Sequence, residues 1–596
     1  MKNLTSKELR IAWKEFYKER GHADAGTVSL ISDGATGVLF NVAGMQPLMP
    51  YLLGAPHPSG STRLYNVQGC VRTNDIDSVG DTSHVTFFEM MGSWSLGDYF
   101  KKERTQWSYE LLTQVFGFTT DQLAATVFEG DENAPRDTET AQCRIASGFK
   151  PENIYFLPAD DNWWGLEYGP CGPDSEMFYI NDCAPCGPDC RPGCDCGKYI
   201  ELGNDVFMQY EKKQDGQIVE LSKKNVDTGW GLERILAFLN GTYDVYRTDV
   251  FEKAISYLEE KSQKKYKEDE EITKAMRIVA DHIRTATMLI GDEAKLTPSN
   301  IGQGYILRRL IRRAVRYART LNLGTENLKD LSLIYINEIY AEAYPRLVEN
   351  TDFILAELVK ECNKFANTVE KGVKELNKVL ATLTANGEKM MDGATSFRLY
   401  DTFGFPIELT VEMAAENGFE VDVDAFNVAF KEHQDKSRSV AKNVMKSGLE
   451  ETTEATIKHH TATHLLNAAL KKVISPDTHQ RGSKISEDKF RFDFNCDHKL
   501  TDEELKSIED LINSWIKEEI EVKWEEMPKM KAVEEGAEHE FIDKYPDIVK
   551  VYTIGDVSKE ICTGPHVENT SKLGTFKILK EKSSSSGVRR IEAMAE

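Results

Sequence analysis

Long apolar runs and a signal-like N-terminus are both missing from the sequence. No run approaches the roughly 20 apolar residues that a membrane-spanning helix needs. The first residues, MKNLTSKELRIAWKEF, hold no apolar signal segment and are typical of an amphipathic helix behind a Thr/Ser cap. We therefore expect no membrane partner and a cytoplasmic location.

Positive charge is also scarce. The chain has 73 Lys and Arg against 97 Asp and Glu, for a net charge of −24. This balance argues against a protein that coats nucleic acid through its overall charge. A local basic stripe can still govern nucleic-acid binding within an acidic whole, so that class of partner stays open.

The 11 cysteines are few for 596 residues and unevenly spread, because five lie between Cys183 and Cys196. In a cytosolic chain such crowding favours metal binding over disulfides. The hydrophobic content of 40% and charged content of 29% fit a globular protein with a substantial core. The length suggests several domains.

Hydrophobic periodicity divides the chain into three parts. Residues 1–245 alternate short apolar or aromatic runs with helical patterns, and hairpin-like spacing indicates antiparallel strands. Residues 246–445 have helical spacing throughout, as in ITKAMRIVADHIRTATMLI and GYILRRLIRRAVRYARTL. Residues 446–596 mix helix with alternating strands such as DKFRFDF, IEVKWEEM and IVKVYTI. We predict a multidomain α+β fold with domains 1–245, 246–445 and 446–596.

Two segments of the first part could hold a nucleotide. In GCVRTND and the following TFFEMMGSWSLGDYF, Arg72 could bind a phosphate and a Phe could stack on a base. The ordinary alternative for Arg72 is an ion pair within a sheet. In NVDTGWGLERI, Gly229 and Gly231 permit close backbone approach, and Arg234 emerges where a helix begins.

The order of these segments makes them specific. VLFNVAGMQPLMPYLLG, GCVRTND…TFFEMMGSWSLGDYF, EYGPCGPDSEMFY, GNDVFMQY and KKNVDTGWGLERI follow the order of a class II aminoacyl-tRNA synthetase core. Residue by residue, these segments resemble those of the alanyl-tRNA synthetase family. That resemblance implies an antiparallel sheet flanked by helices, and an enzyme that activates alanine with ATP and transfers it to tRNA.

The resemblance also assigns roles in the nucleotide site. Arg72 would contact the α-phosphate of ATP and the alanine carboxylate. Phe87 or Phe88 would stack beside adenine, with Arg234 over its other face. Attack of a carboxylate on the α-phosphate needs positive charge and positioning more than acid–base chemistry. Mg²⁺ on the triphosphate is expected.

In the alanine pocket, the family's pattern assigns Asp227 to the alanine ammonium, and Gly229 leaves room for a small side chain. Trp163 and Val206 match positions that wall the pocket, and Asn204 would hydrogen-bond nearby. An ammonium held by one carboxylate fixes the end of the substrate that does not react.

A basic stripe lies in the second part. The segment GYILRRLIRRAVRYARTL places four arginines on one helical face. They are Arg308, Arg312, Arg316 and Arg319. The alternative is a solvated face with salt bridges to an acidic chain. Because no acid occurs within the segment, we predict phosphate contact instead.

The resemblance extends to this region. TPSNIGQGYILRRLIRRAVR and FRLYDTFGFPIELT are similar to the family segments that read the acceptor stem of alanine tRNA. Asn300 and Asp401 match positions that contact its G·U pair, and such side chains suit a shallow minor groove. Family members often have an acid after that Asn and a base before GY, where this chain has Ile301 and Gln303.

The cysteine-rich loop CAPCGPDCRPGCDC is typical of a structural tetrathiolate zinc site. Five cysteines compete for four places, and Cys171 is a sixth candidate. The five are Cys183, Cys186, Cys190, Cys194 and Cys196. The alternative is a reduced surface loop with free thiols.

A second candidate metal site joins two distant segments. KHHTATHLL sets His460 and His464 four residues apart, and KEICTGPHVENT sets Cys562 and His566 at the same separation. HxxxH alone favours an amphipathic core helix over a metal site, but the second pair completes a tetrahedral Zn²⁺ set.

The HxxxH…CxxxH arrangement resembles the editing domain of alanyl- and threonyl-tRNA synthetases. The function implied is hydrolysis of tRNA mischarged with serine or glycine, which differ from alanine by one small group. Thr463 and Gln480 match editing-pocket positions. Zn²⁺ could anchor the substrate or activate a water, and both roles stay open.

Two features of the family are missing. A Gly-rich β-barrel usually precedes HxxxH, whereas here a polar stretch leads straight into it. The C-terminal coiled coil and tRNA-elbow domain also have no counterpart, so we expect a monomer. We predict an alanine–tRNA ligase with zinc-dependent editing. The rivals are a hydrolase that only edits and a tRNA-binding scaffold, and intact Arg72, Asp227 and Arg234 argue against the hydrolase.

Overall fold

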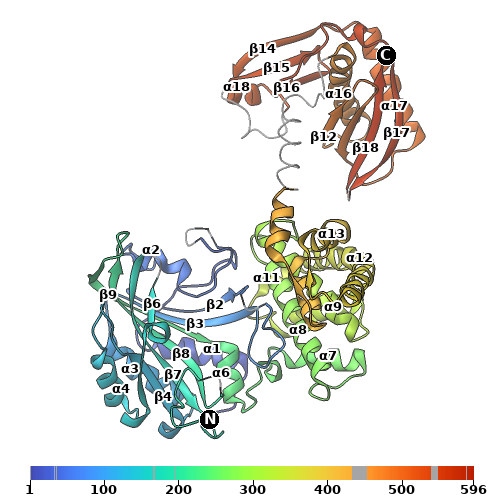
Figure 1. The fold of residues 1–596 in the computed structure, drawn as a ribbon. Helices are drawn as coiled ribbons and strands as arrows, with labels where there is room; N and C mark the ends of the chain where they lie inside the picture. The colour runs from blue at the N-terminus through green and yellow to red at the C-terminus, as the bar shows by residue number, and fades with distance from the viewer. Residues whose placement is uncertain are drawn as a thin grey trace. The chain divides into compact units, whose positions relative to one another are not determined.

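A computed structural model of the chain describes residues 2–596 except residues 33, 35, 36, 75, 166, 167, 195, 433–452, 539–547 and 586, and of residues 367, 368 and 585 only the backbone. It contains two compact units (Figure 1), one formed by residues 1–391 with 395–421 and the other by residues 392–394 with 422–596. The predicted boundary between residues 445 and 446 lies outside the described residues.

A large mixed sheet organises the first unit. Its order is β1-β2-β3-β9-β8-β7-β4-β5, with β6 paired to β7, and among the described ladders of this sheet only β1–β2 and β4–β5 are parallel. The strands are β1 (Ala23–Asp24), β2 (Arg63–Val71), β3 (Phe87–Leu96), β4 (Leu123–Phe128), β5 (Ile154–Leu157), β6 (Trp163–Gly165), β7 (Gly169–Ile180), β8 (Tyr199–Lys212) and β9 (Ile218–Gly231).

Helices cover one face of this sheet (Figure 1). They are α1 (Ser6–Lys18), α3 (Lys101–Glu110), α4 (Thr138–Ser147) and α6 (Leu232–Leu239). The expected N-terminal helix forms as α1, where Thr5 and Glu8 make a capping box that satisfies two free backbone N–H groups. The short helices α2 (Met49–Leu52) and α5 (Ala159–Asn162) complete the part up to residue 245.

The helical spacing between residues 246 and 432 produces helices as predicted, and the two segments quoted above form α8 and α9. The described elements are α7 (Glu252–Ser262), α8 (Glu270–Ile290), α9 (Gly302–Thr320), α10 (Thr325–Ile334), α11 (Pro345–Glu349), α12 (Thr351–Asn386), α13 (Gly393–Phe403), α14 (Ile407–Glu416), and the short strands β10 (Met390–Met391) and β11 (Glu420–Val421). One hydrophobic core runs from the sheet into these helices and includes Phe87 and Tyr340.

The second unit is α+β. It has two sheets, ordered β12-β13-β18-β17 and β14-β15-β16. Its elements are α16 (Glu454–Val473), β12 (Gln480–Ile485), β13 (Phe490–Asn495), α17 (Asp502–Lys517), β14 (Val522–Pro528), α18 (Lys529–Glu534), β15 (Ile548–Ile554), β16 (Ser558–Ile561), β17 (Phe576–Ser585) and β18 (Val588–Ala595). The three alternating segments predicted as strands form β13, β14 and β15.

The fold class is therefore the predicted one: a mixed, mainly antiparallel sheet with flanking helices, a helical region and an α+β unit. Within the ranges that the structure describes, every helix is too short or too polar to cross a membrane.

Candidate active site and metal centre

The pleat of the central strands gathers the predicted alanine-pocket residues on one face of the sheet. Across the β8–β9 ladder, Asn204 lies opposite Gly229 and Val206 lies opposite Asp227. Trp94 of β3 lies opposite Asp227 on its other side. Because directly opposed residues in a ladder share a face, these five side-chain positions surround one patch.

Asp227 is a buried carboxyl group at the centre of this patch. It is 8% exposed, and its Oδ1 accepts a hydrogen bond of 2.6 Å from Trp94 Nε1. Burial raises the pKa of Asp227 to about 7, although the Trp94 donor acts in the opposite direction. The ionised carboxylate is therefore costly without a cation, which suits a site for an ammonium group.

Gly229 brings the backbone close to a neighbouring side chain. A Cβ at this position would lie 2.7 Å from Met90 Sδ, so Met90 would have to move. Met90 Sδ in turn accepts from the Gly44 N–H at 3.1 Å. The absence of a side chain at position 229 thus lets Met90 lie against the strand beside Asp227.

Asn204 offers an unused acceptor to the same patch. Its Nδ2 donates to Asp174, and its Oδ1 is buried without a hydrogen-bond partner. Asn162 also donates to Asp174. An unpaired buried amide oxygen is uncommon and indicates a position that a ligand donor could satisfy.

Two carboxyl groups of β7 were missed by the sequence reasoning. Asp174 lies opposite Val206, and Glu176 lies opposite Asn204, so both share the face of Asp227. Burial raises the pKa of Asp174 to about 7. Burial and then the charge of Glu201 raise the pKa of Glu176 to about 9. The alternation within CGPDSEMF was the signal that could have identified them.

The structure separates Phe87 from Phe88. Phe87 is fully buried and packs edge-on against Tyr340, whereas Phe88 alternates to the face of Met90. The exposed Arg72 follows β2 and places its guanidinium carbon 4.9 Å from the centroid of the Phe88 ring. Phe88, rather than Phe87, is therefore available for stacking.

Arg234 lies in the first turn of α6, directly after β9. Its Nη1 donates to Glu201 Oε2 at 2.6 Å, and both side chains are about two-fifths exposed. The guanidinium is therefore held from β8 while one side stays open to solvent.

The two neighbouring tryptophans of β6 point to different surroundings. Trp163 stacks on Tyr210, with ring centroids 5.7 Å apart, and packs against Phe128. Trp164 instead packs against the cluster that contains Val206 and Trp94. Trp164, rather than the predicted Trp163, is thus the tryptophan beside the pocket.

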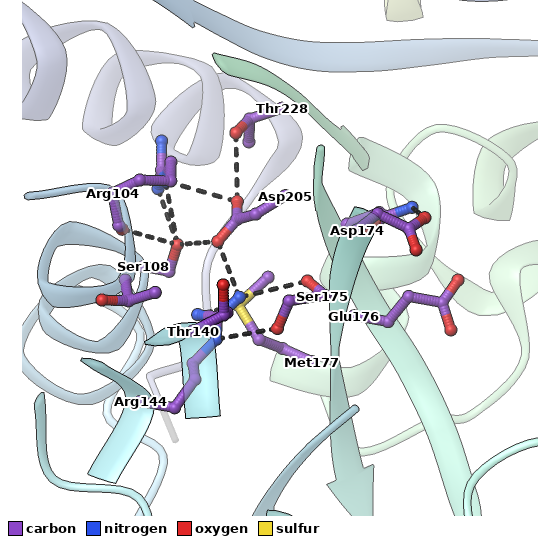
Figure 2. Close-up of polar contacts among 12 residues, drawn as sticks. Arg104, Ser108, Thr140, Arg144, Asp174, Ser175, Glu176, Met177, Asp205 and Thr228 are labelled. Carbon is purple, nitrogen blue, oxygen red and sulfur yellow. Dashed lines mark hydrogen bonds and ion pairs between the residues drawn. The ribbon is translucent and has the colours of Figure 1, made fainter. Parts of the chain in front are cut away.

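A buried ionic network lies beneath the pocket on the opposite face of the sheet (Figure 2). Asp205, between Asn204 and Val206, contacts Arg104 at 3.3 Å and Arg144 at 2.9 Å, and all three are fully buried. Ser108, Ser175 and Thr228 complete the network through hydrogen bonds to its members. Figure 2 shows Asp174 and Glu176 pointing away from Asp205. The network thus ties α3 and α4 to the strands that carry the pocket.

In the helical region, Asn300 and Asp401 are both exposed, as contact residues for a nucleic acid need to be. Arg308 donates to Asn300 Oδ1. Ile301 beside it is 76% exposed. The structure thus links Asn300 to the first arginine of the basic stripe.

Three arginines of the stripe have acidic partners from distant helices. Arg308 and Arg312 both pair with Glu361 of α12, and Arg316 pairs with Glu412 and Glu416 of α14. These partners lie outside the α9 segment, so the segment's own lack of acids did not reveal them. The arrangement matches the salt-bridge alternative for Arg308, Arg312 and Arg316, while Arg319 stays exposed.

The second unit brings the two predicted ligand pairs together. The ligand atoms all lie within 4.8 Å of one another, and His460 Nε2 is 3.4 Å from Cys562 Sγ. The four residues are His460 and His464 on α16, and Cys562 and His566 after β16. Four N and S donors at this spacing fit a tetrahedral Zn²⁺ ion.

Each histidine of this cluster has its Nδ1 occupied by a neighbour. His460 Nδ1 lies 3.2 Å from Pro565 O, His464 Nδ1 lies 2.8 Å from Glu560, and His566 Nδ1 lies 3.3 Å from Thr461 Oγ1. These contacts orient every Nε2 inward, and His566 Nε2 is buried without a partner. Such outer contacts are typical of metal-binding histidines.

Thr463 and Gln480 lie on different elements of this unit. Thr463 is buried on α16, where its hydroxyl donates to His460 O at 2.7 Å. Gln480 begins β12, and its Nε2 donates to Ser483 Oγ at 3.1 Å.

The cysteine-rich loop also forms a cluster. Cys186, Cys190 and Cys194 have sulfurs within 4.8 Å of one another, whereas Cys183 is exposed and lies outside this group of described residues. Cys171 is buried in the sheet.

Comparisons with known proteins agree with this geometry. A family model described as "tRNA synthetases class II (A)" matches residues 8–487, and one described as "Threonyl and Alanyl tRNA synthetase second additional domain" matches residues 549–592. Together the two matches extend over both compact units.

Relatives match over the whole chain. An alanine–tRNA ligase of Treponema denticola is 49% identical over 599 residues, covering 100% of each chain. One of Borrelia hermsii is 47% identical, covering 98% of this chain and 99% of the relative. One of Thermotoga maritima is 35% identical over 711 aligned positions, covering 100% of this chain and 80% of the relative. With the family models and the full-length identity taken together, the chain belongs to the alanyl-tRNA synthetase family of class II aminoacyl-tRNA synthetases.

Proposed function

We infer that the protein is an alanine–tRNA ligase that forms alanyl-adenylate from alanine and ATP and then transfers alanine to the 3′ end of its tRNA. The observation that carries this inference is the buried Asp227 carboxyl group beside Gly229, on the same sheet face as Phe88. A pocket for a small ammonium compound then adjoins a surface for a nucleotide base.

Each residue has a distinct part in the first step. Asp227 holds the alanine ammonium, and the free Oδ1 of Asn204 accepts one of its N–H groups. Val206 and Trp164 wall the side-chain pocket, and Gly229 leaves room for the small side chain of alanine. Arg72 neutralises the α-phosphate and positions the attacking carboxylate, which is electrostatic work rather than proton transfer.

The nucleotide site needs two further contributions. Phe88 and Arg234 cover the two faces of adenine, since one is flat and apolar and the other is planar and cationic. Mg²⁺ accompanies ATP and neutralises part of the triphosphate charge. We propose that Glu176 lies toward that cation, because it is a carboxyl group on the pocket face of β7, on the same face as Asp174.

For tRNA recognition, we propose that Asn300 and Asp401 contact the acceptor stem at a G·U pair and that Arg308 contacts a neighbouring phosphate. Arg308, Arg312 and Arg316 would contact phosphates only by exchanging their glutamate partners. We assign the main role to Arg308 because it also contacts Asn300. The three-domain division, the monomeric state and the cytoplasmic location remain predictions of the sequence.

We propose that the second unit hydrolyses seryl- and glycyl-tRNA. His460, His464, Cys562 and His566 would hold Zn²⁺, which either anchors the substrate or activates water. Thr463 and Gln480 are proposed to contact the misplaced amino acid. The need for such a site is physical, since a pocket that accepts alanine cannot strongly exclude glycine.

A His460→Ala variant is expected to accumulate seryl-tRNA while its alanine-dependent pyrophosphate exchange stays within about twofold of the wild type. The reason is that the ligand cluster and the alanine pocket lie in different units. Aminoacylation of alanine tRNA with alanine, serine and glycine measures both activities. The exposed His498→Ala serves as the matched control.

Two outcomes would contradict this scheme. If the wild type supports no alanine-dependent pyrophosphate exchange, the proposed ligase function is wrong. The editing-only hydrolase or the tRNA-binding scaffold is then favoured. If His460→Ala loses both activities together, the cluster is structural rather than an editing site.

The KM for alanine is expected to rise about tenfold for each pH unit below about 7, and to be flat above about pH 8. Alanine binds as an ammonium ion and needs the Asp227 carboxylate ionised. Burial raises the pKa of Asp227 to about 7, so at lower pH alanine must displace a proton. Pyrophosphate exchange at saturating ATP measures this KM. The dependence should persist in Asp174→Asn, and a flat profile in the wild type would refute the assignment.

A further inference from the structure

The connection between β7 and β8 is long and rich in cysteine. The ladder closes at the pair Ile180 and Tyr199, which leaves residues 181–198 between the strands. Connections longer than roughly 12–15 residues without secondary structure are uncommon in compact domains. A loop of this length therefore needs something other than backbone pairing to order it.

Three of its sulfurs form one close group, and a fourth contacts one of the three. Those of Cys186, Cys190 and Cys194 are within 4.8 Å of one another, and Cys190 Sγ is 3.6 Å from Cys196 Sγ. A tetrahedral zinc site with Zn–S bonds of about 2.3 Å places its sulfurs about 3.8 Å apart. A disulfide, by contrast, has sulfurs about 2.05 Å apart.

The backbone of the loop turns the sulfurs inward. The N–H of Cys190 donates to Gly187 O at 3.2 Å, and that of Cys194 donates to Arg191 O at 3.1 Å. Each bond closes a tight turn that ends on a cysteine. Gly193, with φ of 91°, has the left-handed backbone that the second turn requires. Two successive turns thus place the sulfurs of Cys190 and Cys194 close together.

We propose that four of the five loop cysteines hold a structural Zn²⁺ ion as a tetrathiolate. The four are Cys186, Cys190, Cys194 and Cys196. A closed set of four thiolates leaves no open position for substrate, so this ion would be structural rather than catalytic. Cys183 is excluded because, among the described residues, its sulfur takes part neither in the close group of three nor in the Cys190–Cys196 contact.

The base of the loop is compatible with bound metal. Asn181 and Lys198 join the two ends, because Asn181 N–H donates to Lys198 O at 2.8 Å and Lys198 Nζ donates to Asn181 O at 2.6 Å.

This zinc site would order two strands of the alanine pocket. β7 carries Asp174 and Glu176 on one side of the loop, and β8 carries Glu201 and Asn204 on the other. Glu201 in turn holds Arg234. The ion would therefore fix the spacing of pocket residues without touching the substrate.

Metal analysis of the purified full-length chain tests the proposal. Zinc per chain is measured by plasma mass spectrometry for the wild type, Cys190→Ser, Cys186→Ser and the control Cys183→Ser. We expect each of the first two variants to lose about one equivalent relative to the wild type, and Cys183→Ser to lose none. Repeating Cys190→Ser in a His460→Ala background separates this ion from the one proposed for editing.

A second measurement identifies the ligands. Co²⁺ loaded into the His460→Ala variant should give the intense thiolate-to-cobalt charge-transfer absorption of a four-sulfur site, and Cys186→Ser should weaken it. Unchanged zinc content in both Cys186→Ser and Cys190→Ser would overturn the proposal. So would a Cys190–Cys196 disulfide found by non-reducing peptide mapping, or bound iron in place of zinc.

Discussion

An Asp227→Asn variant is expected to lose about two to three orders of magnitude in kcat/KM for alanine in pyrophosphate exchange. Removing one partner of a buried, hydrogen-bonded charge pair costs about 2–5 kcal/mol. Asparagine has the volume of aspartate, and its Oδ1 can still accept from Trp94, so the fold is preserved. The loss then reports the missing charge opposite the alanine ammonium.

The chemistry of the ammonium sharpens this prediction. Alanine, serine and glycine share that group, so Asp227→Asn should lower activation of all three by the same factor. The KM for ATP should stay near the wild-type value. Glu220→Gln, which neutralises an exposed carboxylate on the same strand, is the control. A kcat/KM within about threefold of the wild type, or a changed ratio among the three amino acids, would place the ammonium elsewhere.

Periodic segments could be predicted well from the sequence, because their apolar spacing reports which face is buried. The basic helix α9 and the strand β15 are examples. It was harder to predict which of two neighbouring residues in a strand faces the pocket. Phe87 and Phe88 differ only by the side of the sheet that each faces, and so do Trp163 and Trp164. A motif match that is uncertain by one residue therefore exchanges a core side chain for a pocket side chain.

Long-range ionic partners could not be predicted. Arg312 is paired by Glu361 and Arg316 by Glu412, and each acid is presented by a different helix. Counting acids near the arginines in sequence cannot detect such pairs. The metal-ligand pair His460 and His464 was easier to predict, because a four-residue spacing on a helix fixes the relative direction of two side chains.

Asp205 illustrates the same difficulty at the active site. No motif singles it out, and its partners Arg104 and Arg144 come from separate helices. Its neighbours Asn204 and Val206 face the pocket, so the alternation of β8 alone places Asp205 on the hidden face. What it contacts there depends on how α3 and α4 pack, which local sequence does not specify.

Replacing Asp205 by Ala is expected to destabilise the first unit by about 3–5 kcal/mol, because it leaves two fully buried guanidinium groups without the carboxylate they share. The loss of stability is measured from the urea midpoint of that unit, which hydrogen exchange in peptides of β8 and β9 monitors. Asp215→Ala, at the exposed turn between these strands, should change it by less than about 0.5 kcal/mol.

The Asp205→Asn variant keeps the prediction testable if the alanine variant does not fold. Asparagine has one acceptor oxygen, so it can keep the hydrogen bond from Ser108 or the one from Thr228, but not both and not the charge. A loss no larger than that of the alanine variant is therefore expected. Its KM for alanine should also rise, with the KM for ATP little changed, since Asn204 and Val206 flank the altered residue. If Asp205→Ala unfolds at the same urea concentration as the wild type, then Arg104 and Arg144 are stabilised by other contacts, and the network does not hold the pocket strands in place.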